Sequence, residues 1–228
     1  MTFHRTRFGW LALALLILLL AWDASSLDMA LARWVGGPQG FPLRDHWLLT
    51  RVLHDAMKVL AWGFVVVLCL GVVWPRGPLQ ALPFARRVQL PATALIASLA
   101  VSALKGASAT SCPWDMAEFG GVAQHLSHWV GWFVADGGGG HCFPAGHATT
   151  GFAFVGGYFA LRRQLPRLAW VWLALALATG FALGAVQQLR GAHFMSHTLW
   201  TAWICWTVGW LADPLFEGEA NRQALPST

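Results

Sequence analysis

Polar and ionisable side chains interrupt an otherwise apolar chain between residues 105 and 197. Lys105 ends one apolar stretch, His147 opens another, and Arg190, His193 and His197 surround the start of a third. In a helix beginning near Arg190, these last three residues follow at spacings of three and four and share one face. Imidazole can act as nucleophile or acid near neutral pH, and Lys and Arg hold anions. The pattern indicates chemistry on an anionic group.

The segment Pro144-Ala145-Gly146-His147 leads directly into the fourth apolar stretch. Glycine lets the backbone approach a ligand closely, and the free amides at a helix N-terminus bind anions. We therefore expect the backbone at Ala145 and Gly146 to bind an anion together with Lys105 and Arg190.

The elements that must position these residues lie in a membrane. The chain has 228 residues, of which 57% are hydrophobic and only 11% charged, against about 25% charged in soluble domains. This deficit excludes a disordered chain, a nucleic-acid-binding domain and an ordinary soluble enzyme. The net charge of +5 is not concentrated in a cluster that could grip a nucleic acid, so we expect no nucleic-acid partner.

Six stretches approach the length of about 20 apolar residues that a bilayer requires. The sequence therefore predicts an all-α polytopic membrane protein, residues 1–228 forming one domain: six transmembrane helices in one bundle, with a long outer loop between the third and fourth. The stretches are Phe8–Trp22, Met57–Trp74, Val88–Leu104, Ala148–Leu161, Leu168–Val186 and Phe194–Leu211.

The distribution of Lys and Arg predicts the orientation, because cytoplasmic loops carry an excess of both. With the N-terminus inside, nine of the 15 basic residues fall on the inner side, and residues 106–161 contain none. We expect a bacterial inner-membrane protein with both termini cytoplasmic and the active site periplasmic. Trp22-Asp23 is a poor cleavage context for a signal peptide, so the first helix is expected to be retained.

Three ordered motifs in this chain resemble those of the type 2 phosphatidic acid phosphatase family of integral membrane lipid phosphatases. That family carries Lys-x6-Arg-Pro, Pro-Ser-Gly-His and Ser-Arg-x5-His-x3-Asp. Here Lys105 is followed after six residues by Cys112-Pro113, the second motif is the segment Pro144 to His147, and His193 supplies the third-motif His. The strict match covers residues 105–197.

The chain departs from the family pattern at four positions. Cys112 stands in place of the first-motif Arg, Ala145 in place of Ser, Gln187 in place of the third-motif Arg, and His197 in place of the orienting Asp. Two guanidinium groups are thus missing from their expected places. Arg190, one turn before His193, is our candidate substitute.

The resemblance implies that His193 attacks phosphorus to form a phosphohistidine and that His147 protonates the departing oxygen, without a metal ion or cofactor. Candidates to orient His193 are His197 and a carboxylate folded back from the outer loop, Asp115 or Asp136. The implied partners are the bilayer and a membrane lipid phosphate: undecaprenyl diphosphate, a lipid A phosphate, phosphatidylglycerophosphate or phosphatidic acid. No obligate protein partner is evident.

Cys112 and Cys142 both fall in the outer loop, which is an oxidising location in a bacterial inner-membrane protein. We expect a disulfide between them. It would tie the first motif to the second.

Three other functions are compatible with the sequence. A lipid phosphotransferase would use the same phosphohistidine, with an acceptor hydroxyl in place of water. A zinc-dependent membrane hydrolase could use His193 and His197 with His125, His128 and His141. A transporter would use the polar cluster as a substrate path, although the cluster lies on one side of the membrane and no inverted repeat is visible.

Overall fold

The computed structural model describes residues 2–223, and its regular structure there is helical. The first half contains α1 (Thr2–Asp23), α2 (Leu27–Val35), α3 (Met57–Val73) and α4 (Phe84–Ala107). The second half contains α5 (Thr149–Phe152), α6 (Gly157–Leu161), α7 (Pro166–Leu189) and α8 (Met195–Gln223). A π-helical stretch, η1 (Leu48–Ala56), leads into α3 without a break, and 3₁₀ turns η6 (Gly146–Ala148) and η7 (Ala153–Gly156) flank α5.

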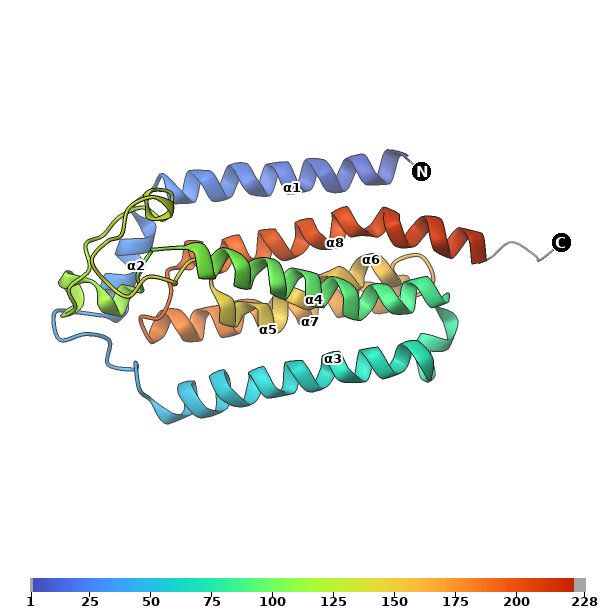
Figure 1. Cartoon of the computed structure of the whole chain (residues 1–228), viewed down its shortest axis with the longest axis horizontal. Helices are drawn as coiled ribbons and strands as arrows, with labels where there is room; N and C mark the ends of the chain where they lie inside the picture. Colours follow the sequence, from blue (N-terminus) through green and yellow to red (C-terminus); the bar gives the residue numbers. More distant parts are fainter. Residues whose placement is uncertain (1, 224–228) are drawn as a thin grey trace.

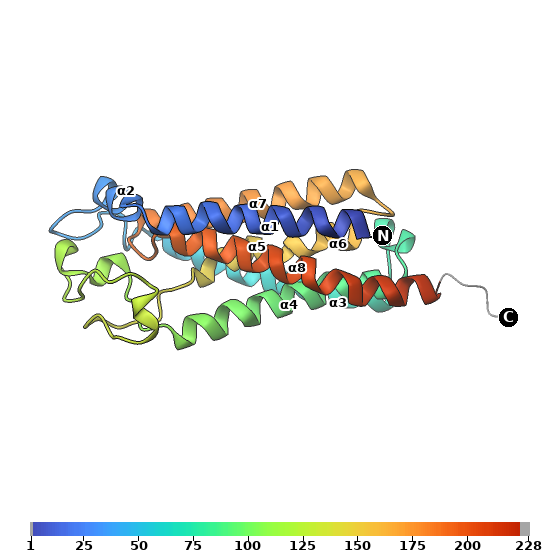
Figure 2. The ribbon, with the colours of Figure 1, turned by 90° about the horizontal axis from the view of Figure 1, so that it is seen from above.

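The long helices run side by side along one axis (Figures 1 and 2). The beginning of α1, the end of α8 and the α3–α4 and α6–α7 connections lie at one end of the bundle. Helix α2 and the loop of residues 108–145 lie at the opposite end. This arrangement agrees with the predicted alternation of inner and outer segments, while its orientation in a membrane stays a prediction.

Four helical stretches among the described residues are long and apolar enough to cross a membrane: Thr6–Asp23, Leu48–Val73, Phe84–Ala107 and Pro166–Leu189. They correspond to the first, second, third and fifth predicted spans. The predicted fourth span is divided into α5, η7 and α6, and the predicted sixth span lies in α8, which is rich in Trp and Thr and is not among these four. Six crossings therefore stay a prediction.

Glycines explain why the divided α5–α6 segment fits inside the bundle. A Cβ at Gly151 would lie 2.2 Å from the Gly180 nitrogen of α7, and one at Gly156 would lie 2.3 Å from Thr93 Oγ1 of α4. Small residues of this kind let membrane helices approach closely, and irregular backbone is tolerated where protein rather than lipid surrounds it. Trp172 Nε1 donates to the Phe154 carbonyl at 2.6 Å, which satisfies one backbone group of η7.

Polar and apolar clusters fix the two ends of the bundle. At the end that holds the α6–α7 connection, Asp213 of α8 accepts from Arg86 of α4 at 2.6 Å and from Arg162 at 2.7 Å. At the other end, Met116 and Phe119 of the long loop pack with Phe194, just before α8. The loop is therefore packed over the start of α8, where the third motif lies.

Candidate active site

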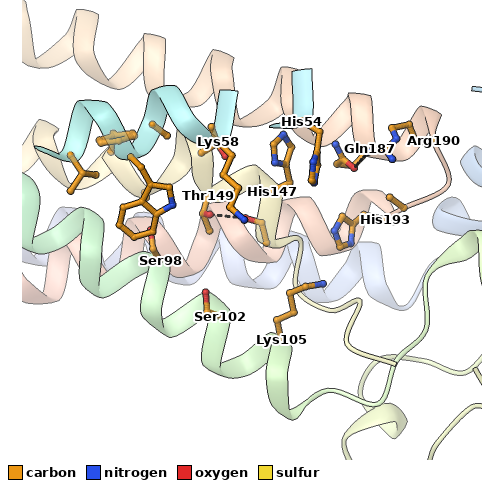
Figure 3. Close-up of a pocket in the computed structure, with 18 of the residues that line it drawn as sticks. His54, Lys58, Ser98, Ser102, Lys105, His147, Thr149, Gln187, Arg190 and His193 are labelled. Atoms are coloured by element: carbon orange, nitrogen blue, oxygen red, sulfur yellow. Dashed lines mark hydrogen bonds between the residues drawn. The ribbon is translucent and has the colours of Figure 1, made fainter. Parts of the chain in front are cut away.

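A cavity of about 520 Å³ lies near the loop end of the bundle, between α3, α4, the second-motif segment and the end of α7. Figure 3 shows several of its lining side chains converging on one space. Among the described residues that line it, none is Asp or Glu, so the pocket is suited to an anion. Its ionisable residues are His54, Lys58, Lys105, His147, Arg190 and His193.

His193 precedes α8 and is buried, with 6% of its surface exposed. Its Nδ1 lies 3.4 Å from Nδ1 of His197 and 3.5 Å from the sulfur of Cys142. The other ring nitrogen, Nε2, is thus the one left for the pocket. Burial, together with the positive charge of Lys105, lowers the pKa of His193 to about 3. The ring is therefore neutral at physiological pH, which is the form that carries a lone pair for attack.

His147 lies in η6, where its ring stacks on that of His54 with centroids 4.3 Å apart. Its Nε2 lies 2.8 Å from the Leu53 carbonyl oxygen. Since a carbonyl only accepts, this nitrogen carries the proton of the neutral ring. Burial lowers the pKa of His147 to about 4, although the bond to Leu53 opposes that shift. To act as an acid at its second nitrogen, His147 must take up a further proton.

Three basic side chains, Lys58, Lys105 and Arg190, surround the imidazoles. Lys105 donates from Nζ to the His141 carbonyl, and a Cβ at Gly146 would lie 3.2 Å from Lys105 Cδ, so glycine leaves room for this side chain. Arg190 donates from Nε to the Arg44 carbonyl at 2.9 Å. The ammonium group of Lys58 has no hydrogen-bond or ion-pair partner among the described residues and is free for a ligand.

The structure brings together most of the predicted site. Five of the predicted residues line the pocket: Lys105, Gly146, His147, Arg190 and His193. Ala145 does not line it, and its amide donates to the His197 carbonyl at 3.1 Å rather than facing a ligand.

The candidates for orienting His193 lie in different places. His197 is buried directly behind it. Asp115 accepts from the indole of Trp114 at 3.1 Å, and Asp136 accepts from the amide and hydroxyl of Ser111, each at 2.6 Å. No described contact joins either carboxylate to His193. Both carboxylates instead make hydrogen bonds within the long loop.

Sequence reasoning missed two contributors to the pocket and assigned no role to a third. His54 and Lys58 come from η1 and α3, and their spacing of four at the head of an apolar stretch was the available signal. Gln187, at the third-motif Arg position, accepts from Arg190 Nη1 at 3.1 Å through Oε1. Its buried Nε2 has no partner among the described residues and is a spare donor for an anion.

Cys112 and Cys142 form a disulfide, and Cys112 lines the pocket at the first-motif Arg position. The sulfur of Cys142 also packs 2.8 Å from the Ala192 carbonyl oxygen, so the bridge supports the backbone beside His193. Potential ligand atoms of Cys142, His193 and His197 lie within 4.8 Å of one another. The disulfide removes the thiolate that a metal would need. His125, His128 and His141 form no such group within the described part of the chain.

A comparison with known protein families agrees with this geometry. Residues 87–217 match the PAP2 superfamily, and the chain belongs to it. Members of this superfamily are phosphatases that act on phosphate esters, often those of lipids. No curated protein and no solved structure matches the chain. The matched region begins within α4, so α1, η1 and α3 lie outside it.

Proposed function

We propose that the protein is a lipid phosphate phosphatase that hydrolyses a phosphomonoester or diphosphate of a lipid through a phosphohistidine at His193. The observation that carries this proposal is the pocket. Three basic side chains and three imidazoles, from the continuous η1–α3 stretch, α4, the second-motif segment and the α7–α8 connection, surround one space that no described carboxylate lines. The Lys and Arg distribution supports a bacterial inner-membrane location with this pocket on the periplasmic side.

The apolar part of the pocket supports a lipid substrate. Beyond its ionisable end, the cavity continues between α3 and α4 along Trp62, Val65 and Leu95. A neighbouring apolar pocket of about 320 Å³ shares Ala61 and Phe154 with it and reaches α7. A phosphate held at the ionisable end would place its hydrocarbon tail along these surfaces, within the depth of the bilayer.

The chemistry follows from the positions of the groups. Nε2 of His193 forms a bond to phosphorus as the bond from phosphorus to the lipid oxygen breaks, and a protonated His147 gives its proton to that oxygen. Lys58, Lys105 and Arg190 balance the charge on the phosphoryl oxygens, as positive groups must in this type of reaction. Water then attacks phosphorus as the bond from phosphorus to Nε2 of His193 breaks, and the nitrogen of His147 that gave up its proton takes one from the water. This step releases phosphate and restores both imidazoles.

Turnover of lipid phosphates by the purified protein tests the proposal. We expect phosphate release from phosphatidic acid or a polyprenyl diphosphate in detergent micelles, and an acid-labile phosphoprotein when the reaction is quenched at alkaline pH. His193→Gln should lose both signals. His46→Gln changes an exposed imidazole outside the pocket and should keep both. Phosphate release by His193→Gln at the rate of the unchanged protein would contradict the mechanism.

A further inference from the structure

A second cavity, of about 380 Å³, lies between the end of α1, α2 and the long loop. His197 lines this cavity, whereas His193 lines the first one. The two residues are one helical turn apart, and their Nδ1 atoms lie 3.4 Å apart. The pair therefore separates the substrate pocket from a second polar space.

The second cavity contains a buried carboxylate without a full set of partners. Oδ2 of Asp23 accepts from the indoles of Trp200 at 2.9 Å and Trp129 at 3.2 Å. Oδ1 of Asp23 is buried and has no hydrogen-bond partner among the described residues. A buried negative charge is costly unless a positive group compensates it. Two neutral indoles do not supply that positive charge.

An imidazole lies between this carboxylate and His197. Nε2 of His128 is 3.2 Å from Asp23 Oδ2, although it is not aligned for a hydrogen bond. The His128 ring stacks on the Phe143 ring, with the two centroids 4.1 Å apart. It lies edge-on to the His197 ring, with centroids 6.1 Å apart. Nearby, Thr110 Oγ1 is also buried and unpartnered.

A series of four side chains thus leads from α1 to the nucleophile: Asp23, His128, His197 and His193. We propose that Asp23, acting with His128, is a positioning residue that supplies the negative charge missing from position 197. This inference rests on the proposed function. The inference goes beyond the proposed function because it assigns a role to α1, which lies outside the superfamily match.

The charge balance of the reaction gives Asp23 its role. When Nε2 of His193 bonds to phosphorus, the lipid oxygen leaves with the electron pair of its bond, and the imidazole becomes cationic while Nδ1 keeps its proton. That proton is shared with Nδ1 of His197. His197 is neutral, so it can accept the hydrogen bond but cannot balance the charge. A fixed carboxylate behind it, shielded from bulk water, stabilises the cation without reorganising.

A double-mutant cycle with His197→Asp tests this role. Asp23→Asn keeps the shape of the side chain and an oxygen that can accept from the tryptophans. We expect it to lower kcat about 10- to 100-fold with KM changed less than threefold. His197→Asp places a carboxylate beside His193 and makes Asp23 redundant. In that background, Asp23→Asn should change kcat less than twofold. Glu118→Gln removes an exposed carboxylate paired with Arg33 at the rim of the cavity and should leave kcat unchanged.

The outcomes separate this inference from the proposed function. An unchanged protein that neither releases phosphate nor becomes phosphorylated would overturn both. An active unchanged protein with equally active Asp23→Asn would overturn only the inference. Equal losses from Asp23→Asn in both backgrounds would show a purely structural role and also overturn it. Thermal unfolding in detergent checks that each variant is folded, and His128→Gln takes the place of Asp23→Asn in the cycle if the latter does not fold.

Discussion

The rings of His54 and His147 stack with centroids 4.3 Å apart and an interplanar angle of 27°. This contact joins η1, which lies outside the superfamily match, to the second-motif segment within it. The same stretch of η1 supplies the Leu53 carbonyl that fixes the proton on His147 Nε2. The candidate acid is therefore oriented by a part of the chain that its motif does not include.

The first prediction concerns the leaving group. If His147 is the general acid, its removal matters only when the departing oxygen needs a proton. We expect His147→Ala to lose about 10²- to 10⁴-fold in kcat on an alkyl phosphate but much less on p-nitrophenyl phosphate, whose leaving group is stable as an anion. His193→Ala should lose activity on both. Steady-state rates with the two substrates check this, and equal losses by His147→Ala on both would exclude the acid role.

The second prediction concerns pH. Because the pKa of His147 is lowered to about 4 in the free protein, its protonated form becomes scarcer as the pH rises. We expect kcat/KM on an alkyl phosphate to fall between pH 5 and 8. A bound phosphate raises the pKa of His147, so the alkaline decline in kcat should lie at higher pH than that in kcat/KM. Profiles of both parameters are the measurement, and coincident declines would contradict this assignment.

The third prediction concerns Lys58. Its free ammonium group lines the pocket from α3, and a hydrogen bond between charged groups contributes about 1.5–3 kcal/mol. We expect Lys58→Met to lower kcat/KM roughly 10- to 100-fold. Arg76→Met is the matched control, because Arg76 is exposed beyond the other end of α3. Similar effects of the two changes would mean that overall charge, and not contact with phosphate, is responsible.

The fourth prediction concerns the disulfide. Cys112 and Cys142 are 30 residues apart, and closing a loop of this length contributes roughly 3–4 kcal/mol on the chain-entropy model. The double change Cys112→Ser, Cys142→Ser should lower the free energy of unfolding by about that amount, and activity should fall because the bridge packs against His193. Denaturant unfolding with and without reductant is the measurement. Reductant should destabilise the unchanged protein and leave the double variant unaffected.

The fifth prediction concerns zinc. Reduction of the bridge frees the Cys142 thiol beside His193 and His197, which gives three potential ligands within 4.8 Å. We expect Zn²⁺ to inhibit the reduced protein at concentrations that leave the oxidised protein active. Cys142→Ser should remove this sensitivity. Activity of the oxidised protein should survive chelators, and its loss on chelation, restored by zinc, would support the zinc-hydrolase alternative instead.

The helical class and the positions of four spans could be predicted because apolar length is a local property of the sequence. The division of the α5–α6 segment could not be predicted, because it depends on the close contacts of Gly151 with α7 and of Gly156 with α4. The meeting of Lys105, His147 and His193 in one pocket was predictable from ordered motifs at one end of the bundle, and that of Arg190 from its position one helical turn before His193.

The contributions of η1, α3 and α1 were not predicted. The spacing of His54 and Lys58 indicates a shared helix face, but nothing local indicates which elements that face meets. In the count of basic residues that predicts the orientation, Lys58 is assigned to an outer loop. Asp23 is interpreted only as a polar residue at the end of the first span. Their surroundings come from contacts across many residues: His147 lies 93 residues after His54, and Trp200 lies 177 residues after Asp23. Local patterns carry no information about such pairings.

The two sides of the pocket differ in how firmly they are held. His147 sits at the head of a segment enclosed by glycine contacts, and His193 is backed by a covalent bridge. His54 and Lys58, by contrast, belong to the helical stretch Leu48–Val73. Only 11% of the residues in the most apolar part of that stretch are buried. A bulky hydrocarbon could thus be admitted sideways from the bilayer by tilting that outer helix, while the reacting imidazole stays where it is.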